Sequence, residues 1–202
     1  MLFHGLRSSS GRGILLARRQ GLTWRSRRTR KSSAPLNFSV RRQENMTATA
    51  RKVLHDLQVA HELLEVEENA ERFRILWVAT TALARAVGHV LQKVDSDRSP
   101  KLRVAIAQLY KTWKANSENH RIFFEFIEDE RNSVLKEYEF GFLSGPVEVV
   151  VLPDGLSATL DENLFCPLSV GRYAGEDCRD VMGLAINWWQ TQLEAIDCAT
   201  TA

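Results

Sequence analysis

The spacing of apolar residues after Met46 is the feature that most constrains how this chain folds. As far as Phe140 they recur three or four positions apart, an interval that places side chains on one face of an α-helix. The pattern predicts helices at about residues 47–69, 70–94, 101–116 and 122–140. It therefore predicts a mainly α protein, built as a bundle of about four helices.

The expected helix boundaries follow from polar residues and proline. Thr47 or Thr49 is a candidate N-cap for the first helix, and Ser99 followed by Pro100 is typical of the start of the third. The second helix, 70–94, is apolar nearly all round, as expected for the central helix of a bundle.

The apolar period changes from helical to extended after Pro146. The β-branched run "VEVVVL", the turn "PDG" and the run "LSATL" predict a small β-hairpin within about 146–165. A final helix is predicted from about Gly175 to Asp197. The hairpin edge and the flank of this helix at Trp188 are candidate surfaces for a protein partner.

Charge divides the chain into a basic leader and an acidic body. Residues 1–43 contain eleven Arg or Lys and no acid, whereas residues 44–202 contain sixteen bases and 25 acids, a net charge of −9. Residues 1–45 are predicted to be a disordered leader outside the fold, and 46–202 a single domain. The leader fits an overextended reading frame whose true start is Met46, an organelle transit peptide, or a nucleic-acid-binding arm.

Other patterns limit the location and the chemistry of the protein. Cys166, Cys178 and Cys198 lie at wide spacing, which favours free thiols in the cytoplasm, or in mitochondria if the leader is a transit peptide. No membrane span and no cofactor are expected. The pair His61 and Glu65 provides only two metal ligands, and no G-x-S-x-G, phosphate-loop or H-E-x-x-H motif is present.

An arginine interrupts the apolar stripe of the fourth helix. On ideal helical geometry Arg131 falls near the middle of a stripe that includes Phe123, Leu135 and Tyr138, so it is predicted to be buried. A buried guanidinium needs a carboxylate or another anion. Arg131 is therefore expected either to form a buried ion pair, with Glu128 as the local candidate, or to hold a phosphate in a cavity.

A second polar group is predicted beside Arg131. Arg85 and His89 are four residues apart on the second helix and so share one side of it, away from its main apolar face. With Glu128 and Tyr138 they are the candidate residues of a supporting polar pocket. The alternative is that Arg85 and His89 only meet solvent or acids of a neighbouring helix.

The sequence from about Ala50 to Phe140 resembles the HEPN superfamily of small helical proteins linked to RNA cleavage. The family signature is an arginine, a polar residue and, a few positions later, a histidine, and two copies commonly build one metal-independent site. Here Arg131 and Asn132 match, and Lys136 stands where histidine is expected. A lysine is charged at neutral pH and does not accept the proton. His89 or His120 replaces the base only if the fold brings it near.

The resemblance implies a homodimer that binds RNA or nucleotide through a degenerate nuclease site, with Arg131, Asn132 and Lys136 as the site residues. The sequence favours a non-catalytic role; as an enzyme it would be a metal-independent ribonuclease. The alternative is a non-enzymatic structural or interaction protein. The stretches "RAVGHVLQKVD" and "FIEDERNSVLKEYEFG" also resemble an uncharacterised bacterial family.

Overall fold

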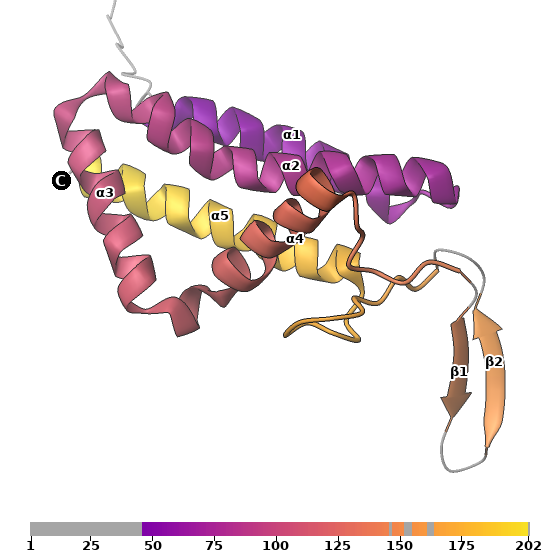
Figure 1. Ribbon diagram of the computed structural model, residues 1–202. Helices are drawn as coiled ribbons and strands as arrows, with labels where there is room; N and C mark the ends of the chain where they lie inside the picture. Colours follow the sequence, from indigo (N-terminus) through magenta and orange to yellow (C-terminus); the bar gives the residue numbers. More distant parts are fainter. Residues whose placement is uncertain (1–45, 146, 152–154, 161–163, 202) are drawn as a thin grey trace, which may run out of the picture. The chain divides into compact units, whose positions relative to one another are not determined.

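The computed structural model describes residues 46–145, 147–151, 155–160 and 164–201 (Figure 1). The predicted leader, 1–45, lies outside the described residues. The helices in chain order are α1 Ala48–Glu65, α2 Ala70–Lys93, η1 Asp95–Arg98, α3 Pro100–Ala115, η2 Ser117–His120, η3 Ile122–Ile127, α4 Glu128–Asn132, η4 Ser133–Glu137 and α5 Cys178–Thr201. The predicted mainly α class with a helical bundle is confirmed.

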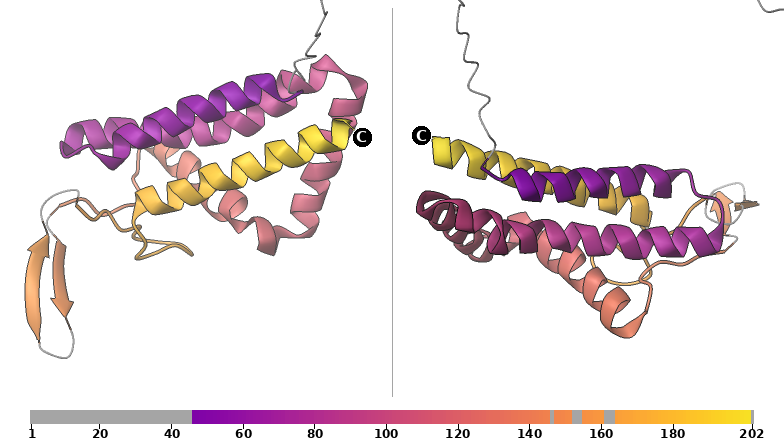
Figure 2. Two further views of the ribbon diagram at one scale, coloured as in Figure 1. Left: turned by 180° about the vertical axis from the view of Figure 1, so that it is seen from behind. Right: turned by 90° about the horizontal axis from the view of Figure 1, so that it is seen from above.

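Helix α1 packs along α2 for most of its length and also packs against α5, whereas α2 and α5 contact each other over a shorter stretch (Figure 2). Each contributes one apolar face to the core, which explains the three- and four-residue spacing in the sequence. The largest completely buried side chains include Leu57 and Leu64 of α1, Trp77 of α2 and Trp189 of α5. Trp189 lies against α2, where its indole donates to the Ala84 carbonyl oxygen, whereas Trp77 faces the fourth helix at Phe126.

Helix α2 is the most apolar helix of the bundle. Segment Ala70–Arg98 is long and apolar enough, by length and composition alone, to cross a membrane. A helix inside a bundle core meets the same criterion, and Phe73, Trp77 and Val87 of α2 are buried within this core. Only 33% of this apolar window is buried, however, and Ile75 is 63% exposed, so the core accounts for one face of α2 and not for its apolar residues all round.

The N-terminus of α1 is capped by a residue distant in sequence. The Asp95 carboxylate accepts the backbone N–H groups of Thr49 at 3.2 Å and Ala50 at 2.8 Å, and Asp95 is completely buried. The Thr47 hydroxyl makes no cap bond and donates instead to Asp197 of α5, at 2.9 Å. Thr47 therefore occupies the N-cap position as predicted, but a tertiary contact with Asp95 supplies the acceptor in place of its hydroxyl.

The start of α3 is as predicted. The Ser99 hydroxyl accepts the N–H of Leu102 at 3.1 Å, and Pro100 occupies the first turn, where its missing N–H has no cost. Helix α3 diverges steeply from α2 at the corner formed by η1 (Figure 1). Residues of α2, α3 and α5 line a pocket near this corner.

The predicted fourth helix runs from Ile122 to Glu137 and contains two π-helical segments, η3 and η4, on either side of α4. It ends before the predicted Phe140 because Tyr138 adopts the left-handed conformation, with φ of 56°. Bonds from residue i to i+5 widen the helical turn, so the direction of side chains departs from ideal α-helical spacing.

Two strands, β1 Val147–Val151 and β2 Leu156–Leu160, pair antiparallel with Val149 opposite Ala158. They lie where the sequence pattern changes from helical to extended. Their side chains are not described, and the predicted role of this edge in pairing stays a prediction. After them, Asp177 accepts the N–H groups of Cys166 and Arg179, both at 2.9 Å, and so attaches the segment before α5 to the start of that helix.

We predict that Asp95→Ala lowers the free energy of unfolding by about 1–2 kcal/mol, because two N–H groups at the start of α1 lose their acceptor. Urea denaturation of the full chain measures the change. Asp97→Ala is the control, since Asp97 is exposed and pairs only with exposed Arg103; it should change stability by less than about 0.5 kcal/mol. Equal effects of the two substitutions would contradict the cap.

Candidate functional site

Glu130 is the charged residue of the fourth helix that faces the core, although Glu130 and Arg131 are both half-buried. The Glu130 carboxylate lies against α2, where it accepts the indole N–H of Trp77 at 3.0 Å and the backbone N–H of Gly141 at 3.2 Å. A Cβ at position 141 would stand 2.5 Å from a Glu130 oxygen, so a larger residue here would displace the end of the Glu130 side chain. Glu130 therefore joins three segments: α4, the centre of α2 and the chain after η4.

Arg131 is half-buried, and the apolar stripe on which its burial was predicted is narrower than expected. The expected stripe included Leu135 and Tyr138, but these side chains are 45% and 64% exposed. The buried apolar residues are Phe123, Phe126, Ile127 and Val134, and Glu130 lies on their side of the helix. Because Leu135 and Tyr138 do not belong to the buried stripe, the stripe is narrower at one edge. Its centre therefore lies at Glu130 and not at Arg131.

Burial raises the pKa of the Glu130 carboxyl above its usual value, while the hydrogen bonds from Trp77 and Gly141 act in the opposite direction. Burial thus deprives the ionised carboxylate of part of the solvation that it would have in water. The two N–H donors replace some of that solvation. No cation contacts this carboxylate in the described residues, so its hydrogen bonds carry the interaction.

Arg131 lies half-buried at the edge of a groove between α2 and α4. The groove has a volume of about 440 Å³, and its polar lining residues are Arg85, His89, Glu128, Arg131 and Asn132. We call it the Arg131 groove. Five predicted site residues, distant by up to 47 positions in sequence, are therefore brought together.

Contacts inside the groove orient the two arginines. One guanidinium nitrogen of Arg131 donates to the Asn132 side-chain oxygen at 3.1 Å. Arg85 pairs with Glu128 at 3.4 Å, and its guanidinium lies 5.6 Å from the centre of the Phe123 ring. No carboxylate pairs with Arg131 among the described ion pairs, so the predicted buried staple is not formed there.

Two other predicted site residues lie outside the groove. Lys136 is exposed and is absent from its lining, as expected from its large rotation around the helix relative to Arg131. Tyr138 follows the end of η4 and is exposed. The Arg131 groove therefore lacks the lysine that stands at the histidine position of the family signature, but it contains His89.

His120, the other candidate base, lies in an aromatic cluster and does not line the groove. Its Nδ1 accepts the indole N–H of Trp188 at 3.1 Å, and desolvation lowers its pKa. Trp188 is half-buried and contacts Trp113 and Phe123 at ring-centre distances of 4.8 and 5.3 Å. The Trp188 flank proposed as a partner surface is therefore largely used inside the bundle.

The remaining candidates take part in structural contacts. His61 Nε2 lies 2.9 Å from the Arg179 carbonyl oxygen and 3.1 Å from Glu65. Burial raises the pKa of Cys166 to about 11 and that of Cys178 further, so these thiols remain protonated and are poor nucleophiles. No group of three or more metal-ligating side chains occurs among the described residues.

Sequence reasoning missed Ala82 and Ala86, which also line the groove. In "ALARAVGH" these alanines stand three residues before Arg85 and His89, so four-residue spacing repeats for both the small and the polar residues. Small side chains on the same face leave space above the helix. This repeat was the sequence signal for a groove beside Arg85 and His89.

A scan against family models and searches of curated proteins and of solved structures find no match for this chain.

We predict that Glu130→Leu lowers the free energy of unfolding by about 2–4 kcal/mol, because the N–H groups of Trp77 and Gly141 lose their acceptor. Glu130→Gln keeps an acceptor and removes the ionisation. A raised carboxyl pKa means that the protonated form stabilises the fold, so wild-type stability falls as pH rises through the interval above about 4.5.

Urea denaturation between pH 4 and 7 tests the pair of variants. Glu130→Gln should be at least as stable as wild type at pH 7, and the difference should shrink toward pH 4, where wild-type Glu130 is protonated. A Glu130→Gln protein that is as unstable as Glu130→Leu would contradict the assigned contacts.

Proposed function

We propose that this chain is a HEPN-like protein that binds RNA or nucleotide phosphate in the Arg131 groove. The observation that carries the proposal is the meeting of Arg131, Asn132, Arg85 and His89 around one open groove. Two guanidinium groups match the geometry of phosphate oxygens, and an amide and an imidazole add neutral hydrogen-bonding groups.

The charge of the groove supports a phosphate ligand in an otherwise acidic body. Residues 44–202 carry a net charge of −9, which repels a polyanion on average. Within the groove, however, Glu128 is the only acid among the lining residues, against Arg85 and Arg131. A phosphate that replaces Glu128 as the partner of Arg85 would meet both arginines.

His89 lines the groove and is the candidate for the proton acceptor that the local signature lacks. In RNA cleavage without a metal, a base removes the proton of the 2′-hydroxyl, and cations stabilise the charge of the phosphate. His89 is exposed on α2 and has the chemistry of that base, whereas Arg131 and Arg85 have the chemistry of the phosphate contacts. We propose binding as the primary function. Cleavage is a separate activity, which needs its own experiment.

We further propose a homodimer. The HEPN resemblance implies that two copies build one site, and the Arg131 groove is open and bordered by Leu135, an exposed apolar side chain.

Light scattering after size-exclusion chromatography measures the mass of the full chain in solution. The alternative is a structural or interaction protein without a ligand. A failure of RNA binding would favour this alternative.

We predict that Arg131→Ala weakens the binding of short single-stranded RNA about tenfold, because one charge-assisted contact to phosphate is lost. Fluorescence anisotropy with labelled RNA measures the affinity over a series of salt concentrations. Arg74→Ala is the matched control, since Arg74 is exposed on α2 and absent from the groove lining. A wild-type chain without affinity for RNA or mononucleotide, or equal effects of both substitutions, would reject the proposal.

A second prediction separates binding from catalysis. If the groove cleaves RNA, wild type should produce cleaved RNA in the presence of EDTA, and His89→Ala should abolish the products while changing affinity less than Arg131→Ala does. His55→Ala is the control, because His55 is an exposed histidine of α1. RNA binding without products would assign a non-catalytic module; products that persist in His89→Ala would exclude His89 as the base.

A further inference from the structure

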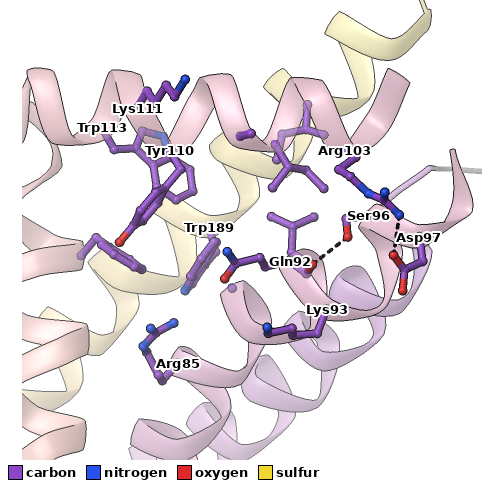
Figure 3. A pocket seen from close by; sticks show the side chains of 16 residues that line it. Arg85, Gln92, Lys93, Ser96, Asp97, Arg103, Tyr110, Lys111, Trp113 and Trp189 are labelled. Carbon is purple, nitrogen blue, oxygen red and sulfur yellow. Dashed lines mark hydrogen bonds and ion pairs between the residues drawn. The ribbon is translucent and has the colours of Figure 1, made fainter. Parts of the chain in front are cut away.

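A second, larger pocket lies on the other side of Arg85, where α2 and α3 diverge above α5. It has a volume of about 580 Å³, within the range of pockets that hold small molecules. Figure 3 shows its aromatic end, with Tyr110, Trp113 and Trp189, and its polar end, with Ser96, Asp97 and Arg103. We call it the Trp189 pocket.

The aromatic end is apolar because its indole N–H groups are already used. Trp189 donates to the Ala84 carbonyl oxygen and Trp113 to the Gln192 side chain, both at 2.8 Å. Both indoles are buried, and Leu91 and Ile106 extend the apolar wall. Because Trp189 is 0% and Trp113 4% exposed, the carbon surface open to a ligand comes mainly from the half-buried Tyr110 and the exposed Ala107 in front of them. Such a surface favours a ring or a hydrocarbon chain over a sugar or an ion.

The rim of the pocket is positively charged. Its lining includes four cations, Arg85, Lys93, Arg103 and Lys111, and one carboxylate, Asp97, which Arg103 already contacts at 2.7 Å. Lys93 has no carboxylate partner among the described ion pairs. In a body with a net charge of −9, a pocket with this excess of cations is suited to an anion.

We propose that the Trp189 pocket binds a small amphiphilic anion, with an apolar body at the aromatic end and a phosphate or carboxylate near Lys93. A nucleoside monophosphate and a fatty acid share this chemistry. The apolar end provides affinity through buried surface, and the cations select the charged group. This site is separate from the Arg131 groove, although Arg85 lines both.

The experiment uses 8-anilinonaphthalene-1-sulfonate, a fluorescent apolar anion, with the folded full chain. Wild type should bind one equivalent saturably and more tightly than N-phenyl-1-naphthylamine, the neutral analogue. Ala107→Trp places an indole in the pocket from an exposed position of α3, and should weaken binding about tenfold or more. Ala115→Trp, at an exposed position of the same helix outside the lining, should leave binding unchanged.

Charge reversal tests the polar end. Lys93→Glu should weaken binding of the anion about tenfold and leave that of the neutral analogue unchanged, whereas Lys101→Glu, the same change at an exposed residue outside the lining, should affect neither. Competition with adenosine monophosphate and with dodecanoate identifies the source of the ligand, because the compound that displaces the probe shares its site.

Three results would overturn the proposal: unsaturable probe binding, equal binding by Ala107→Trp and Ala115→Trp, or displacement by neither competitor. These variants leave Arg131, Asn132 and His89 intact, so their RNA affinity separately reports on the Arg131 groove. Failure of RNA binding with an intact probe site would reject only the proposed function, and the converse result would reject only the Trp189 pocket.

Discussion

The contact of Glu130 with Trp77 and Gly141 determines how the fourth helix lies on the bundle. A carboxylate that has lost solvent must keep its hydrogen bonds, and here one donor belongs to the centre of α2 and the other to the chain beyond η4. With Glu130 directed inward, the next two residues, Arg131 and Asn132, are directed to the edge between α4 and α2. The candidate site thus depends on a residue that does not line it.

Arg85 has a corresponding position between the two proposed ligand sites. It lines the Arg131 groove, pairs with Glu128 and lies over Phe123, and it also lines the Trp189 pocket. Both sites gather cations in a body whose net charge is −9. The mean charge of the domain therefore says little about its ligands, because electrostatic recognition depends on the charges within about one Debye length, roughly 10 Å.

Local patterns predicted the elements that depend on local physics. The apolar spacing predicted the helices, and Ser99 with Pro100 predicted the start of α3, because helix period and capping involve neighbours in sequence. The spacing of Arg85 and His89 predicted that they share a face. The cap of α1 was not predictable, because its acceptor, Asp95, is 46 residues from Thr49. The centre of the apolar stripe was mispredicted because Leu135 and Tyr138 are exposed, and Arg131 is half-buried.

The sequence by itself determined the helical class of this protein and the residue types available for the phosphate-binding site that we propose. Only the tertiary structure decided that Glu130 turns inward, that His89 joins Arg131 while Lys136 and His120 do not, and that α2 and α3 diverge around a pocket. The physical reason is that helix period is a property of neighbouring residues, whereas the burial of a charge and the shape of a pocket depend on which helices meet. The contacts between helices join residues that are distant in sequence, and the helical period does not encode them.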